Sequence, residues 1–366
     1  MKNKMKAIIW DGRNYPEGMY FGEFGIPKPE PGWVLIYVKA CGICGSDVHA
    51  FMGHTRYLMP DENFPTVLGH ENSGVIVEVS DGVTGLKTGD RVAVEPLHSC
   101  IDFGMSCPMC LSGKPVFCQN NKPNQTLIGM PLGRRYLGGY GEYIVANARH
   151  VFKIADNVSF EEAAMADCFG VSLHGVERSR VRLGDTAAVV GCGIIGLCTI
   201  QCLKAKGINN IIGVARYDFQ AEYAKKYGAA HTVMLDDGND PVKEVMKMTD
   251  GWGVNYSFEC VGGNTDAVAQ SIHMCCPGGK AVMLGGASKP RPIDLQGMIL
   301  KESDLLSSMV YTSQEYEVTL GLMRDKLIDM EGLITHRFHP EHFREAIDLN
   351  LNKNNSKMIK AMFVRS

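Results

Sequence analysis

A chain of 366 residues is long enough for about two domains, each with a hydrophobic core of its own. Apolar residues make up 45% of the chain and charged residues 21%, and the net charge is −3, which is ordinary composition for a globular protein. There is no basic excess that would recruit nucleic acid or an anionic membrane, so neither is expected as a partner.

Neither a leader peptide nor a membrane span is predicted. The first residues, MKNKMKAIIWDG, hold too few apolar side chains before Asp11 for the core of a signal peptide. The longest apolar stretch, 187–202, is interrupted by three glycines and by Thr199. We therefore expect a cytoplasmic protein. In that reducing compartment, the thirteen cysteines are expected to be metal ligands or buried thiols rather than disulfides.

The first 155 or so residues predict a β-rich unit. They are rich in Gly and Pro and contain the short apolar runs WVLIYVKA, SGVIVEVSDG, DRVAVEP and GEYIVAN. Such runs between turn residues are typical of mostly antiparallel strands joined by long loops.

The sequence also predicts a catalytic metal site in this unit. Cys44 in CGICGSDVH, with His70 and Glu71 in GHENSG, offers a thiolate, an imidazole and a carboxylate. Three protein ligands and one exchangeable position are typical of a catalytic zinc. His70 by itself would be interpreted as an ordinary loop histidine, but the presence of Cys44 and Glu71 favours a metal site. Ser46 and His49 follow closely, and a hydroxyl and an imidazole in series can carry a proton from an alcohol to solvent.

A second set of metal-binding residues lies in the segment CIDFGMSCPMCLSGKPVFC. Its cysteines are Cys100, Cys107, Cys110 and Cys118. Four thiolates suit a closed, tetrahedral and therefore structural zinc site. A CxxC redox pair and incidental thiols are the alternatives, but a redox pair is expected at a helix start near a βαβ unit, and this segment reads as a loop.

The other cysteines are interpreted as small buried hydrophobic side chains. They are Cys41, Cys192, Cys198, Cys202, Cys260, Cys275 and Cys276.

From about Ser159 the pattern changes to alternating helices and strands. A helix is predicted over 159–178, opened by a capping box of Ser159 and Glu162. The strands TAAVVGCG, NIIGVA, HTVML, VNYSFECVG and GGKAVMLGG follow, with helices between them over about 194–206 and 218–228. This alternation predicts a parallel sheet with helices on both faces. The last residues, SKMIKAMFVRS, predict a closing strand, so the parallel sheet is expected to be inserted into the β-rich part.

The first of these strands runs into VVGCGIIG. Gly191, Gly193 and Gly196 fit the pattern G-x-G-x-x-G directly after a strand and at the start of a helix. The N-terminus of such a helix can hold the pyrophosphate of a dinucleotide.

Taken together, these segments resemble the zinc-dependent medium-chain dehydrogenases, the superfamily of zinc alcohol, sorbitol, butanediol and threonine dehydrogenases. CGICGSDVH, PTVLGHENSGVIVEVSDGV, GDRVAVEP, GGYGEYIV, VVGCGIIG and FECVGG occur in this order along essentially the whole chain. The resemblance implies an α/β fold in which a GroES-like β-rich catalytic domain holds an inserted Rossmann domain with a doubly wound parallel sheet. The expected boundaries are 1–157, 158–300 and a return segment over 301–366. A homo-oligomer, tetramer or dimer, is also implied.

The resemblance also implies roles for individual residues. Cys44 and His70 match the first two ligands of the catalytic zinc, and Glu71 matches the acid beside the metal that can exchange with water. Asp167 matches the third main ligand, with Cys168 as the alternative. The serine and histidine that follow Cys44 match the family's proton relay.

The expected coenzyme site includes Gly191, Gly193, Ile194, Ile195, Gly196, Ala215, Arg216 and Val261. NAD-binding Rossmann domains place an acid about 20 residues past the glycines, where it binds the ribose 2′-hydroxyl. This chain has Ala215 there, followed by Arg216, whose guanidinium can pair with a 2′-phosphate. NADP(H) is therefore expected rather than NAD(H). The alternative is a solvated surface arginine with NAD still preferred, since Asp218 lies close by.

The chain departs from the family in two places. The structural cage normally runs C-x2-C-x2-C-x7-C, but six residues separate Cys100 from Cys107, so Cys100 fits the pattern least well. The Arg-Tyr pair of sorbitol-dehydrogenase-like enzymes is replaced by Val310 and Tyr311, which argues against a sorbitol-type pocket and for a more apolar one.

The sequence thus predicts an oxidoreductase with two zinc ions per chain that interconverts a small secondary alcohol, such as a polyol or sugar-derived alcohol, and its ketone. The first alternative is a threonine-dehydrogenase-like enzyme that uses NAD on an amino alcohol or amino acid. Two others are a zinc-free enoyl or quinone reductase and an inactive dinucleotide-binding structural or sensor protein. The presence of Cys44, His70 and Glu71 argues against both, since neither kind of protein needs the ligands of a catalytic zinc.

Overall fold

The computed structural model describes residues 3–54, 61–120, 137–235, 238–263, 265–286, 290 and 292–366. Two compact units are present. The first unit comprises Met1–Asp167, Thr312–Lys326 and Met330–Ser366, and the second unit comprises Cys168–Tyr311 and Leu327–Asp329. The second unit is therefore inserted into the first along the chain, as predicted, whereas the exact boundaries 1–157, 158–300 and 301–366 stay a prediction.

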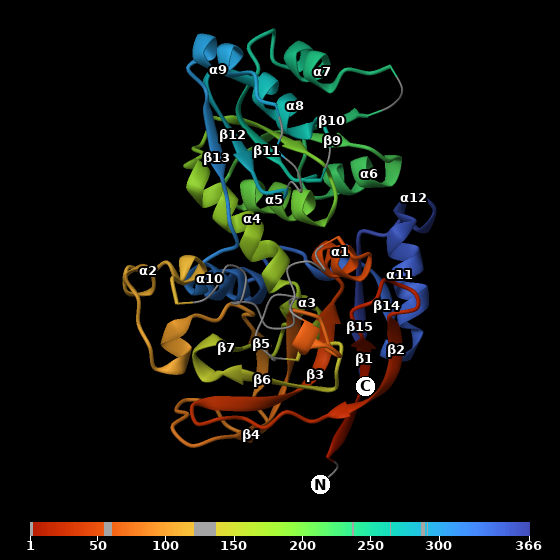
Figure 1. The fold of residues 1–366 in the computed structure, drawn as a ribbon. Helices are drawn as coiled ribbons and strands as arrows, with labels where there is room; N and C mark the ends of the chain where they lie inside the picture. The colour runs from red at the N-terminus through yellow and green to blue at the C-terminus, as the bar shows by residue number, and fades with distance from the viewer. Residues whose placement is uncertain are drawn as a thin grey trace. The chain divides into compact units, whose positions relative to one another are not determined.

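The first unit is built on a mainly antiparallel sheet (Figure 1). Its strands are β1 (Lys4–Trp10), β2 (Met19–Gly25), β3 (Trp33–Gly42), β4 (Glu71–Val79), β5 (Arg91–Val94), β6 (Tyr143–Asn147), β7 (Val151–Lys153), β14 (Ile334–Phe338) and β15 (Lys360–Val364). Within the described residues, the larger sheet has the order β14-β15-β3-β4-β5-β7 with β6 paired to β3, and β1 pairs with β2. All four strands predicted before residue 155 are present.

Short helices connect these strands. The α-helices are α1 (Gly45–Phe51), α2 (Pro108–Leu111), α3 (Phe160–Ala164), α10 (Ser313–Arg324), α11 (Phe343–Leu351) and α12 (Lys353–Ser356). The 3₁₀-helices are η2 (Asp61–Asn63), η3 (Cys100–Phe103), η4 (Pro115–Phe117), η5 (Ala148–His150), η6 (Glu331–Leu333) and η7 (Pro340–His342).

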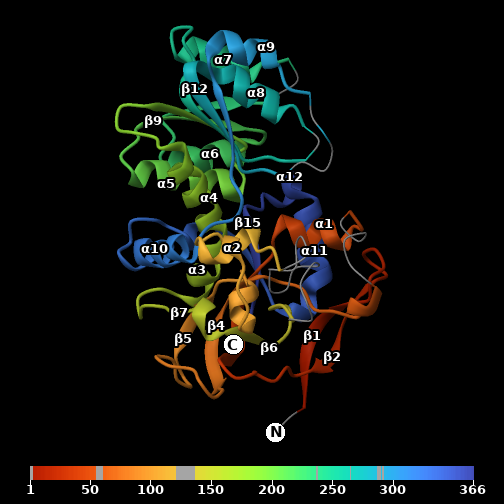
Figure 2. The ribbon, with the colours of Figure 1, turned by 60° about the vertical axis from the view of Figure 1, so that its left-hand side comes forward.

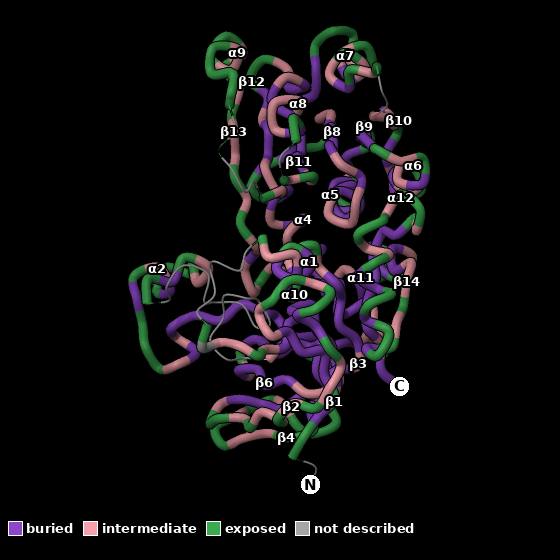
Figure 3. The backbone as a smooth tube through the Cα atoms, turned by 45° about the vertical axis from the view of Figure 1, so that its right-hand side comes forward, coloured by how far each residue is buried: buried purple, intermediate pink, exposed green. Residues whose placement is uncertain are grey.

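Strand β3 is the central strand of the first unit, and its pairing places Glu71. It pairs with β4, β6 and β15, and nearly all of its side chains are buried, which gives a continuous apolar run rather than an alternating one (Figure 3). The register places both Glu71 and Met362 opposite Gly42 at its end. Three segments that are far apart in the sequence therefore meet at that glycine.

The second unit contains a parallel sheet covered on both faces. Its strands are β8 (Thr186–Val190), β9 (Asn210–Ala215), β10 (His231–Met234), β11 (Val254–Glu259), β12 (Cys275–Met283) and β13 (Asp304–Ser307). Its helices are α5 (Ile194–Ala205), α6 (Asp218–Lys226), α7 (Pro241–Met248), α8 (Ala267–Met274) and α9 (Leu295–Lys301). Among the described residues the strand order is β10-β9-β8-β11-β12-β13.

The order reverses between β8 and β11, which makes the sheet doubly wound. Right-handed crossovers then place α5 and α6 on one face and α7, α8 and α9 on the other, as Figures 1 and 2 show. The core holds fully buried side chains from the central strands, among them Val190 and Val214. The predicted fold class is confirmed.

One predicted helix is divided. The segment 159–178 forms α3 and then α4 (Ala166–Ser179), with Met165 between them. The predicted capping box is present, because the hydroxyl of Ser159 accepts from the backbone N–H of Glu162 and the Glu162 carboxylate accepts from the backbone N–H of Ser159. The break follows from the tighter hydrogen bond that Met165 N–H makes to the carbonyl of Glu162.

In the part of the chain that the structure describes, no helix is both long and apolar enough to cross a membrane.

Candidate active site

Cys44, His70 and Glu71 come together in the first unit. Cys44 caps the N-terminus of α1, His70 directly precedes β4, and Glu71 is the first residue of β4. One ligand atom from each lies within 4.8 Å of the others. A thiolate, an imidazole and a carboxylate at this spacing suit a zinc ion with an exchangeable position.

Asp167 lies at the edge of this group. It is in the first turn of α4, and its Oδ2 is 4.0 Å from Nε2 of His70. The neighbouring Cys168 belongs to the second unit and is buried. The Asp167 carboxylate thus lies close to His70. The assignment of the third main ligand to Asp167 rather than Cys168 stays a prediction.

A buried carboxylate lies behind the histidine. Oδ1 of Asp47 is 3.4 Å from Nδ1 of His70, and Oδ2 accepts a 2.7 Å hydrogen bond from the hydroxyl of Tyr140. Burial opposes protonation of His70, but the charges of Asp47 and Cys44 outweigh it and raise the pKa of the imidazole well above its usual value. The site therefore favours a positive charge next to Nε2. A carboxylate behind a ligating histidine is the usual outer-shell partner in metal sites.

Glu71 has a buried cationic partner. Nζ of Lys360 lies 2.6 Å from Oε1 and 2.5 Å from Oε2, and the two residues are 2% and 0% exposed. A side chain at position 42 would collide with this carboxylate, since a Cβ there would lie 1.7 Å from Oε2. Gly42 therefore gives Glu71 the room to reach both the ligand group and the lysine.

Sequence reasoning missed Asp47, Tyr140 and Lys360. Asp47 had a local signal, since it stands at the third helical position after Cys44 and its carboxylate accepts the Cys44 backbone N–H at 3.2 Å. Lys360 had none, because it lies 289 residues from Glu71 in the chain.

Ser46 and His49 both lie on α1, three residues apart and hence on the same face. Nδ1 of His49 is 3.0 Å from Nδ1 of His54. Burial lowers the pKa of His49, and its Coulombic interactions with His54 and Lys353 lower it further. A neutral imidazole in contact with a second, exposed one is able to accept a proton and pass it to solvent.

The four cysteines of the 100–118 segment form a compact sulfur cluster. Sγ of Cys100 is 3.7 Å from Sγ of Cys110, Sγ of Cys107 is 4.0 Å from Sγ of Cys118, and all four lie within 4.8 Å of one another. A tetrahedral zinc with bonds of about 2.3 Å separates its sulfur ligands by roughly 3.8 Å. Backbone N–H groups of Cys100 and Gln119 also donate to Sγ of Cys118 and Cys107. The longer gap after Cys100 therefore does not keep it out of the cluster.

Replacing Cys110 by Ser is expected to remove about one zinc per chain and to lower the unfolding free energy by about 2 kcal/mol, or Tm by roughly 4–8 °C. The measurement is metal content by mass spectrometry together with a calorimetric melt. Cys276→Ser, a partly exposed thiol outside the cluster, is the matched control. A Cys110→Ser protein with full zinc content and an unchanged Tm would refute a structural zinc here.

The thirteen cysteines all lie in described residues, and none of them forms a disulfide. Cys41, Cys192, Cys198, Cys202 and Cys275 are buried as predicted. Cys260 and Cys276 differ, because both are partly exposed.

The glycine-rich loop in the second unit has the geometry of a dinucleotide site. Gly193 caps the N-terminus of α5, which begins at Ile194 and Ile195, so unpaired backbone N–H groups of the first turn face the loop. Gly191 has φ +95, and a Cβ on Gly196 would lie 1.9 Å from the Gly191 carbonyl oxygen. Only glycines permit this close approach of helix and loop.

Two further predicted coenzyme residues lie at strand ends of the same unit. Val261 follows β11, and a Cβ on Gly191 would lie 2.5 Å from its Cγ2, so it borders the loop directly. Ala215 is buried at the end of β9, and Arg216 after it is exposed, with Cζ 5.6 Å from the centroid of the Tyr217 ring.

Comparison with known proteins shows which families the chain resembles. Residues 30–156 match the model of the alcohol dehydrogenase GroES-like domain, and residues 195–325 match that of the zinc-binding dehydrogenases. L-threonine 3-dehydrogenase of Bacillus velezensis is 31% identical over 95% of this chain and 96% of its own length. (R,R)-butanediol dehydrogenase of Bacillus subtilis is 32% identical over 91% of this chain and 92% of its own.

Among solved structures, the alcohol dehydrogenase rspB of E. coli CFT073, crystallised with NADH, superimposes with a TM-score of 0.86 at 29% identity over 100% of both chains. The predicted resemblance is confirmed. This chain belongs to the zinc-dependent medium-chain dehydrogenases and is an NAD(P)-dependent alcohol oxidoreductase of that family.

Proposed function

We propose that the chain is an NADP(H)-dependent zinc dehydrogenase that interconverts a small secondary alcohol, of the polyol or sugar-derived type, and its ketone. The observation that carries the proposal is the grouping of Cys44, His70 and Glu71 within 4.8 Å, with Asp47 behind the histidine. The replacement of the sorbitol-type Arg-Tyr pair by Val310 and Tyr311 supports a more apolar pocket than that of the sorbitol dehydrogenases.

The residues of this chain have separable tasks in the proposal. Cys44, His70 and Asp167, with Glu71 beside them, hold a zinc ion, and a bound zinc supplies Lewis acidity toward the substrate oxygen. Asp47 fixes the tautomer and orientation of His70. The hydroxyl of Ser46 accepts the proton of the alcohol as it donates its own to His49, and His49 passes a proton to His54 and solvent. The glycine loop at the start of α5 holds the coenzyme that accepts the hydride.

The test is a coenzyme-linked absorbance screen across polyols, sugar acids, amino alcohols and short secondary alcohols. Turnover of a secondary alcohol or ketone with NADP(H) supports the proposal. Turnover confined to threonine-like amino alcohols with NAD supports the second candidate, which is favoured by the identity to L-threonine 3-dehydrogenase. Metal content of wild type compared with His70→Ala separates an inactive relic from an enzyme, since an enzyme loses about one zinc ion per chain in the variant and a relic loses none.

Replacing Asp167 by Ala is expected to lower the occupancy of the catalytic zinc and to reduce kcat/KM by about 10–100-fold, because a metal ligand is removed. The matched control is Cys168→Ala in the neighbouring position. Activity and zinc content that survive in Asp167→Ala but are lost in Cys168→Ala would reverse the assignment.

The coenzyme preference is expected to depend on the residues after β9. The double variant Ala215→Asp/Arg216→Ala should shift selectivity from NADP toward NAD by on the order of 10- to 100-fold, because it replaces a cation that can pair with the 2′-phosphate by an acid that repels it. The measurement is kcat/KM for both coenzymes in wild type and variant. A wild-type preference for NAD contradicts the proposal outright.

A homo-oligomer, tetramer or dimer, and a cytoplasmic location belong to the same proposal. Leu295, Ile299 and Leu300 on α9 are 65%, 72% and 77% exposed, and apolar side chains grouped in this way are typical of protein interfaces. Light scattering on the purified protein measures the mass of the assembly, and a monomer at micromolar concentration would contradict it.

A further inference from the structure

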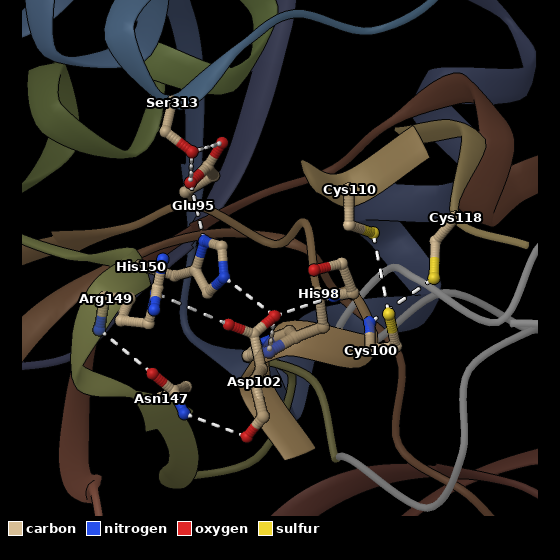
Figure 4. A network of polar contacts seen from close by, with 11 residues as sticks. Glu95, His98, Cys100, Asp102, Cys110, Cys118, Asn147, Arg149, His150 and Ser313 are labelled. Atoms are coloured by element: carbon tan, nitrogen blue, oxygen red, sulfur yellow. Dashed lines mark hydrogen bonds and ion pairs between the residues drawn. The ribbon is translucent and has the colours of Figure 1, made fainter. Parts of the chain in front are cut away.

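A third group of buried metal-ligating side chains lies in the first unit, beside the four cysteines (Figure 4). It consists of His98, Asp102 and His150, called here the histidine cluster. One ligand atom from each lies within 4.8 Å of the others, and the three residues are 2%, 9% and 6% exposed. Neither the predicted catalytic site nor the cysteine site uses any of them.

The ring of His150 is held in a fixed orientation. Its Nδ1 lies 2.7 Å from Oε2 of Glu95, a fully buried carboxylate that also accepts from the hydroxyl of Ser313 at 2.7 Å. The backbone N–H of Glu95 donates to the carbonyl of His150 at 2.9 Å. A histidine that gives one ring nitrogen to a carboxylate has its other nitrogen available as a ligand, and this pairing recurs behind ligating histidines.

The second nitrogen of His150 points into the cluster. Nε2 is buried and makes no hydrogen bond of acceptable geometry to any described residue, although Oδ2 of Asp102 is only 3.0 Å away. The two atoms form a close ion pair. A ligand that contacts both this nitrogen and the carboxylate would satisfy such a buried nitrogen.

Asp102 and His98 are also fixed in place. The Asp102 carboxylate accepts the backbone N–H of Ser99 at 2.7 Å, which closes the first turn of η3. The ring of His98 stacks on Trp33 with a centroid separation of 5.0 Å and an interplanar angle of 5°, and its Nδ1 is 3.7 Å from Oδ2 of Asp102. All three side chains are therefore held before any ligand binds.

We propose that the histidine cluster binds a third metal ion, a divalent ion of the zinc type. Two imidazoles and a carboxylate are competent ligands for zinc. A tetrahedral ion with bonds of about 2.0–2.2 Å separates its ligand atoms by roughly 3.3–3.6 Å, which lies between the 3.0 Å and 3.7 Å distances from Oδ2 of Asp102 to the two rings. The cation also compensates the buried carboxylates of Asp102 and Glu95.

The test compares metal content per chain in wild type and in His98→Phe. Phenylalanine keeps the ring that stacks on Trp33 and removes only the ligand nitrogens. The variant is expected to contain one ion fewer after loading with zinc and removal of free metal. His336→Phe is the matched control, since His336 also stacks on an aromatic ring, that of Phe338, but lies outside the three ligand groups of the described residues. The readout is the difference between proteins, so it does not depend on the occupancy of the other two sites.

A second measurement covers the case in which His98→Phe folds poorly. Cobalt titration of wild type should reveal a site that adds visible d–d absorption without thiolate-to-cobalt charge transfer, because no sulfur ligates in the histidine cluster. Glu95→Gln should weaken cobalt binding at this site by about 10–100-fold and leave the thiolate bands unchanged. Equal metal content in His98→Phe and wild type, or no sulfur-free cobalt site in wild type, overturns the proposal and leaves a hydrogen-bonded His–carboxylate network in its place.

Discussion

Replacing His70 by Ala is expected to lower kcat/KM by about three orders of magnitude or more. His70 is buried among Cys44, Glu71 and Asp167, so its removal takes away the central ligand of the candidate catalytic zinc. Lewis acidity contributes several kcal/mol to such reactions, and each 1.36 kcal/mol corresponds to about a tenfold change in rate. The measurement is kcat/KM together with zinc content, which should fall by about one ion per chain.

The control is His339→Ala, an exposed histidine outside the three ligand groups of the described residues, which should change neither quantity. The melting temperature of His70→Ala shows whether the loss of activity reflects unfolding. A folded His70→Ala protein with its full zinc content and wild-type kcat/KM would remove the basis for a catalytic metal at this place.

Replacing Lys360 by Met is expected to lower the unfolding free energy by about 3–5 kcal/mol. The variant leaves the carboxylate of Glu71 without the cation that contacts both of its oxygens, in a place where both residues are buried. Breaking a buried ion pair by removing one partner costs this much, because the remaining charge stays away from water. Urea unfolding followed by circular dichroism gives the change.

The double variant Glu71→Gln/Lys360→Met separates this cause from lost packing. Glutamine removes the uncompensated charge while keeping the shape of the side chain, so most of the lost stability should return. A double variant as unstable as Lys360→Met alone would show that the aliphatic stem of the lysine, and not its charge, matters.

Local patterns were sufficient to predict several elements of the fold. The capping box at Ser159 and the glycine loop before α5 are contained within a few residues, so their geometry follows from their own chemistry. The same holds for the cysteine segment, in which all four thiols lie within one short stretch of chain. The break at Met165 could not be predicted, since the apolar spacing continues through it and the local hydrogen bond is visible only in the structure.

The surroundings of the site were harder to predict than its ligands. Cys44 and His70 can be identified as candidate ligands by residue type. Lys360 cannot be told apart from the other lysines in the sequence, because only the register of β15, β3 and β4 places it beside Glu71. Glu95 and His150 were not singled out for the same reason, because nothing in the sequence relates two residues 55 positions apart. Partner choice over such distances is decided by strand pairing rather than by local preference.

Because the thiols differ in burial, their alkylation can measure how much of the catalytic site is filled by metal. Of the thirteen cysteines in described residues, Cys44, Cys260 and Cys276 are partly exposed, so an alkylating reagent in solution meets these first. Of these three partly exposed thiols, only Cys44 belongs to a ligand group among the described residues. A sample whose catalytic site holds no metal should therefore gain one adduct more than a sample whose site is occupied. Intact-mass spectra of a briefly alkylated preparation would give the fraction of chains with metal in this site before any substrate is known.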